Sequence, residues 1–94
     1  MKFTILEKKM LYLLSEFRNY DDLETELNDN AVGLYMKDIT EYTDMTTEVA
    51  RGVVSSLVQK DILYTDDVNG KPFYRATDEC LKYLYGTLDK EWGD

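Results

Sequence analysis

The 94-residue sequence contains no histidine, so imidazole catalysis and histidine-containing zinc sites are excluded. Its single cysteine, Cys80, excludes an intramolecular disulfide framework and is compatible with a reducing compartment. No apolar run approaches the roughly 18 residues that are needed to span a bilayer. Glu7, Lys8 and Lys9 interrupt the apolar N-terminus, so a signal peptide is not expected. We therefore expect a cytoplasmic protein that does not use a membrane as a partner.

Basic residues are also few. The sequence has 11 Lys and Arg and 19 Asp and Glu, which give a net charge of -8. This balance makes non-specific binding to nucleic acid or to an anionic membrane unfavourable over most of the surface. The acidic excess is smallest over residues 31–60, which hold three bases and four acids. Proline occurs once, and a hydrophobic content of 44% argues against intrinsic disorder. A chain of this length is expected to form a single domain over residues 1–94.

The sequence offers no motif for catalysis or for cofactor binding. It contains no Gly-rich phosphate loop, no Ser or Cys nucleophile beside a base, and no metal-ligand spacing. The carboxylates of residues 21–30 are more typical of a solvated acidic face than of an acid–base pair. Cys80 lies beside an apolar stripe, which favours a small buried thiol over a redox sensor. We therefore expect no enzyme, no catalytic residue, no cofactor and no metal site.

The N-terminal segment predicts a helix that begins at Thr4, because Glu7 follows at the spacing of a capping box. Its predicted buried stripe repeats at helical spacing and consists of Leu6, Met10, Leu13, Leu14 and Phe17. The acidic segment at residues 21–30 leaves two alternatives open. It forms either a short helix docked by Leu23 and Leu27 or a mobile loop.

A helix–turn–helix is predicted over residues 36–60, after a short strand at residues 31–35. Residues 36–42 form its first helix, and Thr46 or Thr47 N-caps the longer second helix. The second helix buries one face, because four apolar residues recur at positions i, i+3, i+4 and i+7: Ala50, Val53, Val54 and Leu57.

A β-hairpin is predicted over residues 62–76, with strand-like runs at residues 62–65 and 73–76. The dipeptide Asn69-Gly70 between them favours a two-residue turn, in which both positions need positive φ. Pro72 cannot donate a ladder hydrogen bond, so it is expected near the tip or at an open edge.

A last helix is predicted at about residues 77–91, with Thr77 as its N-cap and acidic residues in its first turn. Its predicted apolar stripe consists of Leu81, Leu84, Tyr85, Leu88 and Trp92.

This order of elements resembles a winged-helix domain, and the matching segments are similar to MarR-type regulators. Lys37–Tyr42 resembles the helix before the turn, and Thr46–Val58 resembles the recognition helix of that family. Lys60-Asp61-Ile62-Leu63 lies where the family often has Lys-Gly-Leu-Val. Ala76-Thr77-Asp78-Glu79-Cys80 lies where it commonly has Leu-Thr-Asp-Glu-Gly.

The resemblance implies an α+β, mostly helical fold: a winged helix-turn-helix with a three-helix core, a small β-hairpin wing and a C-terminal helix. The sequence departs from the family at Asp61 and Cys80, which replace glycines. It also lacks the Asp-x-Arg signature in the wing and is shorter than a MarR-type protein. The resemblance therefore implies a winged-helix domain and does not decide whether the chain has the function of that family.

A recognition helix inserts into the major groove, so its exposed face must be polar and not anionic. Arg51 is able to read guanine, Gln59 adenine, and Ser55 either a base or a phosphate. Gly52 costs about 1 kcal/mol of helix propensity, and close approach of another backbone is one reason to keep it. The predicted DNA-binding residues are Lys37, Thr46, Thr47, Arg51, Gly52, Ser55, Gln59, Lys71 and Arg75.

We predict a small transcription regulator that binds double-stranded DNA as a homodimer. Bulky aromatic residues of the terminal helices suit a subunit interface, although a half-buried core position explains them equally well. These candidate dimer residues are Tyr12, Tyr83, Tyr85 and Trp92. The alternative function is an acidic winged-helix interaction module, such as a DNA-mimicking inhibitor, that docks on a basic protein partner.

Overall fold

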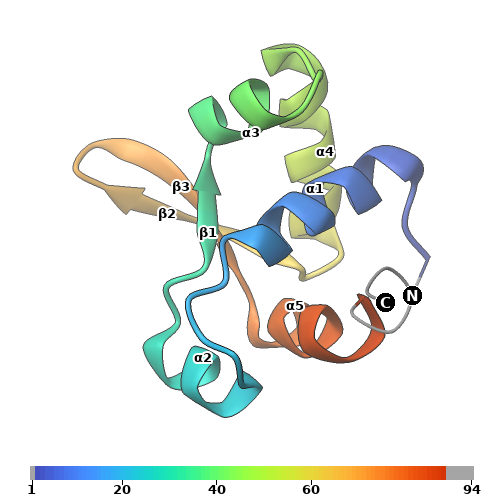
Figure 1. Ribbon diagram of the computed structural model, residues 1–94. Coiled ribbons are helices and arrows are strands. Elements are labelled where there is room, and N and C mark those ends of the chain that lie inside the picture. The colour runs from blue at the N-terminus through green and yellow to red at the C-terminus, as the bar shows by residue number, and fades with distance from the viewer. Residues whose placement is uncertain (1, 89–94) are drawn as a thin grey trace.

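The computed structural model describes residues 2–88, and Figure 1 shows their arrangement. In chain order the elements are helix α1 (Ile5–Glu16), helix α2 (Leu23–Asp29), strand β1 (Gly33–Tyr35), helix α3 (Met36–Tyr42), helix α4 (Thr47–Gln59), strands β2 (Leu63–Val68) and β3 (Lys71–Ala76), helix α5 (Asp78–Tyr83) and the π-helical turn η1 (Leu84–Leu88). This α+β arrangement, with helices α3 and α4 between strands β1 and β2, is compatible with the predicted winged-helix fold.

Helix α1 begins with the predicted capping box. The Thr4 hydroxyl accepts a hydrogen bond from the Glu7 N–H, and the Glu7 carboxylate accepts one from the Thr4 N–H. The predicted buried stripe was wrong at Leu6, which is 37% exposed, whereas Leu11 is completely buried. The Glu7 side chain also points inward. The buried face of α1 therefore includes Glu7, Leu11 and Leu14, and Leu6 lies at its margin.

The acidic segment is a helix, so the loop alternative was wrong. Asp22 N-caps α2 by accepting a hydrogen bond from the Thr25 N–H at 2.9 Å. Leu23 and Leu27 are partly buried and pack against the core, which is the docking that their spacing predicted. Asn30 closes the helix in the left-handed conformation, with a φ of 51°.

The three strands form an antiparallel sheet in the order β1-β3-β2. The predicted turn at Asn69-Gly70 is confirmed, because these residues have φ values of 54° and 79°. The hairpin strands extend further toward this tip than predicted, and Pro72 lies near the tip as expected. We call the hairpin of β2 and β3 the wing, and Figure 1 shows it projecting away from the helices.

Strand β1 pairs with the base of the wing and begins at a position, Gly33, where a side chain would not fit. Tyr35 lies opposite Phe73, and their ring centroids are 4.8 Å apart. At Gly33, an added Cβ would lie 2.5 Å from the Phe73 ring. Glycine is therefore required here so that the ring can cover the strand.

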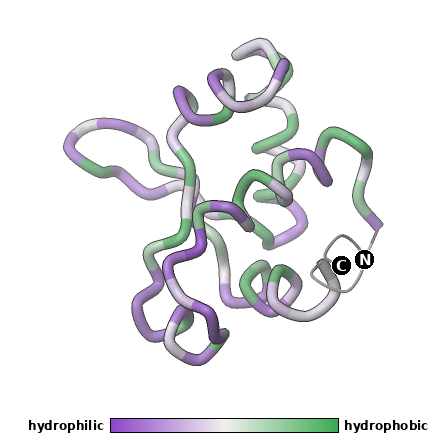
Figure 2. The backbone as a smooth tube through the Cα atoms, in the orientation of Figure 1, coloured by the Kyte–Doolittle hydropathy of each residue, from purple (hydrophilic) through white to green (hydrophobic). Residues whose placement is uncertain are grey.

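One core joins the helices to the inner face of the sheet. The predicted buried face of α4 is confirmed, and Cys80 is a buried thiol as predicted. Burial raises the pKa of the Cys80 thiol to about 12, so the thiol stays protonated. In Figure 2 hydrophobic and hydrophilic stretches alternate along α1 and α5, whereas the α2 segment is mainly hydrophilic. Completely buried apolar side chains include Met10, Leu11, Leu14, Leu34, Ile39, Leu57, Leu81 and Leu84.

Within the described residues, the last predicted helix consists of two parts: α5, which ends at Tyr83, and the π-helical turn η1, which follows it to Leu88. Residues 89–91 of the predicted helix lie outside the described residues. Tyr85 was predicted in the apolar stripe, but its hydroxyl donates to the Tyr20 carbonyl and to the Glu26 carboxylate. Burial, followed by the hydrogen bond to Glu26, raises the pKa of the Tyr85 phenol. Trp92 lies outside the described residues.

Candidate nucleic-acid interface

Helix α4 presents the polar surface that the sequence predicted. Thr46 is its N-cap and accepts a hydrogen bond from the Val49 N–H at 3.2 Å. The buried face fixes the rotation of the helix, so the opposite side is exposed to solvent. We call this exposed side the recognition face, and it consists of Thr46, Thr47, Glu48, Arg51, Gly52, Ser55 and Gln59, so that it carries one carboxylate as well as its arginine.

Arg51 and Gly52 lie next to each other on the recognition face. Among residues 2–88, Arg51 has no ion-pair or hydrogen-bond partner, so its guanidinium is available to a ligand. A Cβ added at Gly52 would meet no atom within 4 Å. Intramolecular packing therefore does not require glycine at this position.

The opposite edge of α4 is anchored to α1 by Glu7, whose carboxylate is completely enclosed. Ser56 donates a hydrogen bond to Glu7, and the Lys60 ammonium lies 2.7 Å from the same carboxylate. Burial by itself raises the pKa of this carboxyl. The hydrogen bonds from Lys60, Ser56 and Thr4 lower the pKa more, to about 2. The sequence indicated Glu7 only as a capping residue, because its contacts with α4 lie 49 and 53 residues away along the chain.

Two of the predicted DNA-binding residues lie away from α4, on the walls of a groove between α3 and the wing tip. Lys37 comes from the first turn of α3, and Lys71 comes from the start of β3. The groove has a volume of about 690 Å³, and both lysines line it. No local sequence pattern indicates this cavity, because its two walls, residues 35–42 and 68–72, are far apart in the chain.

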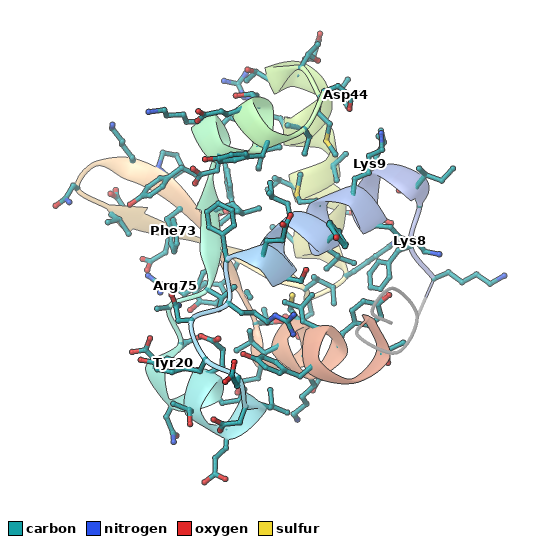
Figure 3. The ribbon with its side chains drawn as sticks, viewed as in Figure 1. Lys8, Lys9, Tyr20, Asp44, Phe73 and Arg75 are labelled. Carbon is teal, nitrogen blue, oxygen red and sulfur yellow. The ribbon has the colours of Figure 1, made fainter. Side chains whose placement is uncertain are left out.

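Arg75 has a different environment, at the base of the wing. Its guanidinium lies 2.8 Å from the Asp66 carboxylate and donates to the Asn30 carbonyl at 2.7 Å. The hydrogen bond from Arg75 lowers the pKa of Asp66. Figure 3 shows Arg75 on the side of the sheet that faces α2. The guanidinium thus joins the wing to the end of α2, and its predicted contact with DNA stays a prediction.

Exposed carboxylates occur on α2 and also within the helix–turn–helix, where Glu41, Asp44 and Glu48 are exposed. Asp21, Asp22, Glu24 and Asp29 are exposed on or beside α2. Figure 1 shows α2 and α3 at opposite ends of the molecule. Distance and salt therefore weaken the repulsion that the α2 carboxylates exert on an anionic ligand at α3 or α4.

The candidate dimer residues also occupy different environments. Tyr12 is 46% exposed on α1, whereas Tyr83 is partly buried and packs edge-on against Phe3, with ring centroids 5.1 Å apart. Tyr85 bonds within the chain, as described above. Of the three described candidates, Tyr12 presents the largest exposed aromatic surface on a regular helix.

Comparison with known proteins supports the fold. No protein-family model matches the chain, and no curated protein sequence matches it. The solved structure of the type III plasmid segregation protein TubR superposes with a TM-score of 0.54, covering 100% of this chain and 95% of TubR. The fold is similar to that of TubR. The sequences are only 12% identical, so the similarity supports the helix–turn–helix arrangement and does not transfer residue roles.

No helix within residues 2–88 is long and apolar enough to cross a membrane.

Proposed function

We propose that this protein is a winged-helix transcription regulator of MarR-like type that binds duplex DNA as a homodimer, without catalytic activity. The observation that carries the proposal is the recognition face of α4. This face is exposed, it is set opposite a buried apolar face, and it holds an arginine that has no partner among the described residues. A helix of this kind after a short helix and a turn has the geometry that inserts into a major groove.

The side chains of this face have the chemistry for base reading. Arg51 is able to donate two hydrogen bonds to guanine, and Gln59 is able to pair with adenine. Gly52 leaves space for close approach of a DNA strand, because nothing in the chain occupies the position of its absent Cβ. Lys37 and Lys71 would contact phosphates on either side and add affinity without reading sequence.

The test is fluorescence anisotropy of the protein with duplexes selected from a genomic pool, across a salt series. We expect Arg51→Ala to weaken specific binding by about 1–3 kcal/mol. About six phosphate contacts per dimer would give a log–log salt slope near −5. The matched control is Lys82→Ala, which removes an exposed charge from α5. Unchanged affinity of the Arg51→Ala protein for a selected duplex would exclude the recognition face.

The rival proposal, an acidic module that docks on a basic protein, is favoured by the exposed carboxylates of α2. Its variants must avoid two residues that hold the fold, the cap Asp22 and the buried Glu26. Asp21→Lys with Glu24→Lys reverses two exposed charges instead. Loss of function in this double variant, together with full function of Arg51→Ala, would favour the rival over DNA binding.

A further inference from the structure

A second groove lies between α1 and the end of α3, and its volume is about 560 Å³. This volume falls within the range of roughly 300–1,000 Å³ that is typical of ligand pockets. One wall consists of residues on one side of α1, at helical spacing: Lys9, Tyr12, Leu13 and Glu16. The other wall consists of residues 41–44, at which α3 ends. We call this cavity the α1–α3 groove.

Each wall of the α1–α3 groove carries a tyrosine with exposed surface. Tyr12 is 46% exposed and Tyr42 is 63% exposed. The Tyr42 ring packs edge-on against Phe17 at the end of α1, with the ring centroids 6.2 Å apart. This contact restrains the Tyr42 ring beside α1 before any ligand binds, so less ordering is needed on binding. The face of a tyrosine ring attracts cations, because the ring quadrupole places negative charge there.

The lining of the α1–α3 groove has an excess of negative charge. It holds one base, Lys9, and three acids, Glu16, Glu41 and Asp44. Lys9 is paired with Asp44 at 3.6 Å, and Figure 3 shows these two side chains next to each other. Lys37, one turn before Glu41 on α3, lines the groove at the wing tip and not this one. Glu16 and Glu41 are exposed and have no ion-pair partner among residues 2–88, so each wall offers one carboxylate to a cation.

We propose that the α1–α3 groove binds a small molecule that carries a quaternary ammonium group. The cationic group lies against Tyr12 and Tyr42, between the carboxylates of Glu16 and Glu41. A quaternary ammonium ion donates no hydrogen bonds and is bound in proteins by aromatic faces, to which carboxylates add charge attraction. A metal ion fits less well, because residues 2–88 contain no group of three or more acidic or cysteine side chains that could hold one. Tyr12 is also a candidate dimer residue, so the ligand would compete with a second copy of the chain. Only this last consequence rests on the proposed function.

The test compares choline with its neutral isostere 3,3-dimethyl-1-butanol, in which a carbon atom replaces the charged nitrogen. Each compound is titrated into the full chain without DNA, and amide chemical shifts are followed by NMR. We expect saturable choline binding, with perturbations at residues 9–16 and 41–44. The isostere should bind about tenfold more weakly, because it has the same shape but no charge for the rings and carboxylates to attract.

Two variants separate the contributions of the carboxylates and of the ring. Glu16→Gln/Glu41→Gln should weaken choline binding about tenfold and leave binding of the isostere unchanged, because two exposed carboxylates no longer attract the cation. The matched control Asp21→Asn/Glu24→Gln removes the same charge from exposed positions at α2 and should bind choline as the unaltered protein does. Tyr42→Leu keeps an apolar side chain but lacks the ring, so it should also weaken choline binding.

Equal affinity for choline and its isostere would overturn the proposal, and so would equal choline affinity of the two double variants. Perturbations centred on α2, or the absence of saturable binding, would overturn it too. The recognition face lies outside the α1–α3 groove, so a failure of choline to bind leaves the proposed DNA binding intact. Light scattering tests the consequence for the homodimer, which choline at saturation should shift toward the monomer mass. A protein that is monomeric without choline would contradict the homodimer and leave the cation site intact.

Discussion

Glu7 illustrates at the scale of one residue how a charge is kept in a small core. Its carboxylate is 1% exposed, and its three hydrogen-bond donors come from two distant parts of the chain. Thr4 belongs to the start of α1, whereas Ser56 and Lys60 belong to the end of α4. A buried carboxylate without such donors would instead be protonated near neutral pH.

We predict a pH-dependent contribution of Glu7 to stability. Its pKa in the folded protein is about 2, below the ordinary value of 4.5, so the ionised form stabilises the fold above pH 4.5. This stabilisation, about 3 kcal/mol at most, is lost as the pH falls through 4.5 toward 2. Urea unfolding of Glu7→Gln should therefore show a large deficit at pH 7 that shrinks toward pH 2.

The matched control is Glu16→Gln, which changes an exposed carboxyl of the same helix. Its difference from the unaltered protein should be small at every pH. A Glu7→Gln deficit that stays constant between pH 7 and pH 2 would show that the charge of Glu7 contributes nothing.

At the scale of an element, helix α4 combines a strongly determined inner face with an unusual outer one. Its inner face is decided by apolar periodicity, which the sequence displays directly. Its outer face includes exposed Val49 and Val58, at 43% and 40%, and a mid-helix glycine. Gly52 lowers the stability of the helix without any packing reason within the chain.

We predict that Gly52→Ala raises stability and lowers DNA affinity. The added methyl meets open space, so the unfolding free energy should rise by up to about 1 kcal/mol. A DNA strand close to Gly52 would clash with that methyl, and the affinity for a selected duplex should fall about tenfold. Thermal unfolding and fluorescence anisotropy measure the two effects. The control Glu16→Ala improves the propensity of α1 and should leave DNA affinity unchanged; unaltered affinity in Gly52→Ala would place Gly52 outside the interface.

The whole molecule carries its acidic excess unevenly. The exposed carboxylates of α2 are separated from α3 by the length of the molecule, as Figure 1 shows, whereas Arg51, Lys37 and Lys71 have no ion-pair partners among the described residues. Lys9 on α1 has one, at 3.6 Å from Asp44 beside the α3–α4 turn, and Figure 3 shows the two next to each other. Specific DNA binding is thus compatible with feeble non-specific binding.

We predict that Tyr12 is needed for the homodimer. It is 46% exposed on a regular helix, which makes it more accessible to a second copy of the chain than the half-buried Tyr83 and Tyr85. Light scattering of the unaltered protein should give twice the chain mass of 11.0 kDa. Tyr12→Glu should give the monomer mass without loss of secondary structure, and Tyr85→Phe should keep the dimer. A dimer that persists in Tyr12→Glu would exclude this face of α1.

The sequence by itself determined the helix–turn–helix and the wing, because these depend on short-range signals. The apolar periodicity of residues 50–57, the cap at Thr46 and the turn at Asn69-Gly70 each act within a few residues. The capping box at Thr4 and Glu7 is equally local, and all four signals agree with the structure.

Only the tertiary structure decided the contacts between distant segments. The burial of the Glu7 carboxylate depends on the donor Ser56 on α4, and the Tyr85 hydroxyl finds its acceptor Glu26 on α2. The fold places the Arg75 guanidinium beside the Asp66 carboxylate and the Asn30 carbonyl, and Arg75 binds both. The groove between α3 and the wing tip brings Lys37 of α3 and Lys71 of the wing into one lining, although they are far apart in the sequence. Side-chain partners of this kind are fixed by packing geometry, which no local pattern in the sequence encodes.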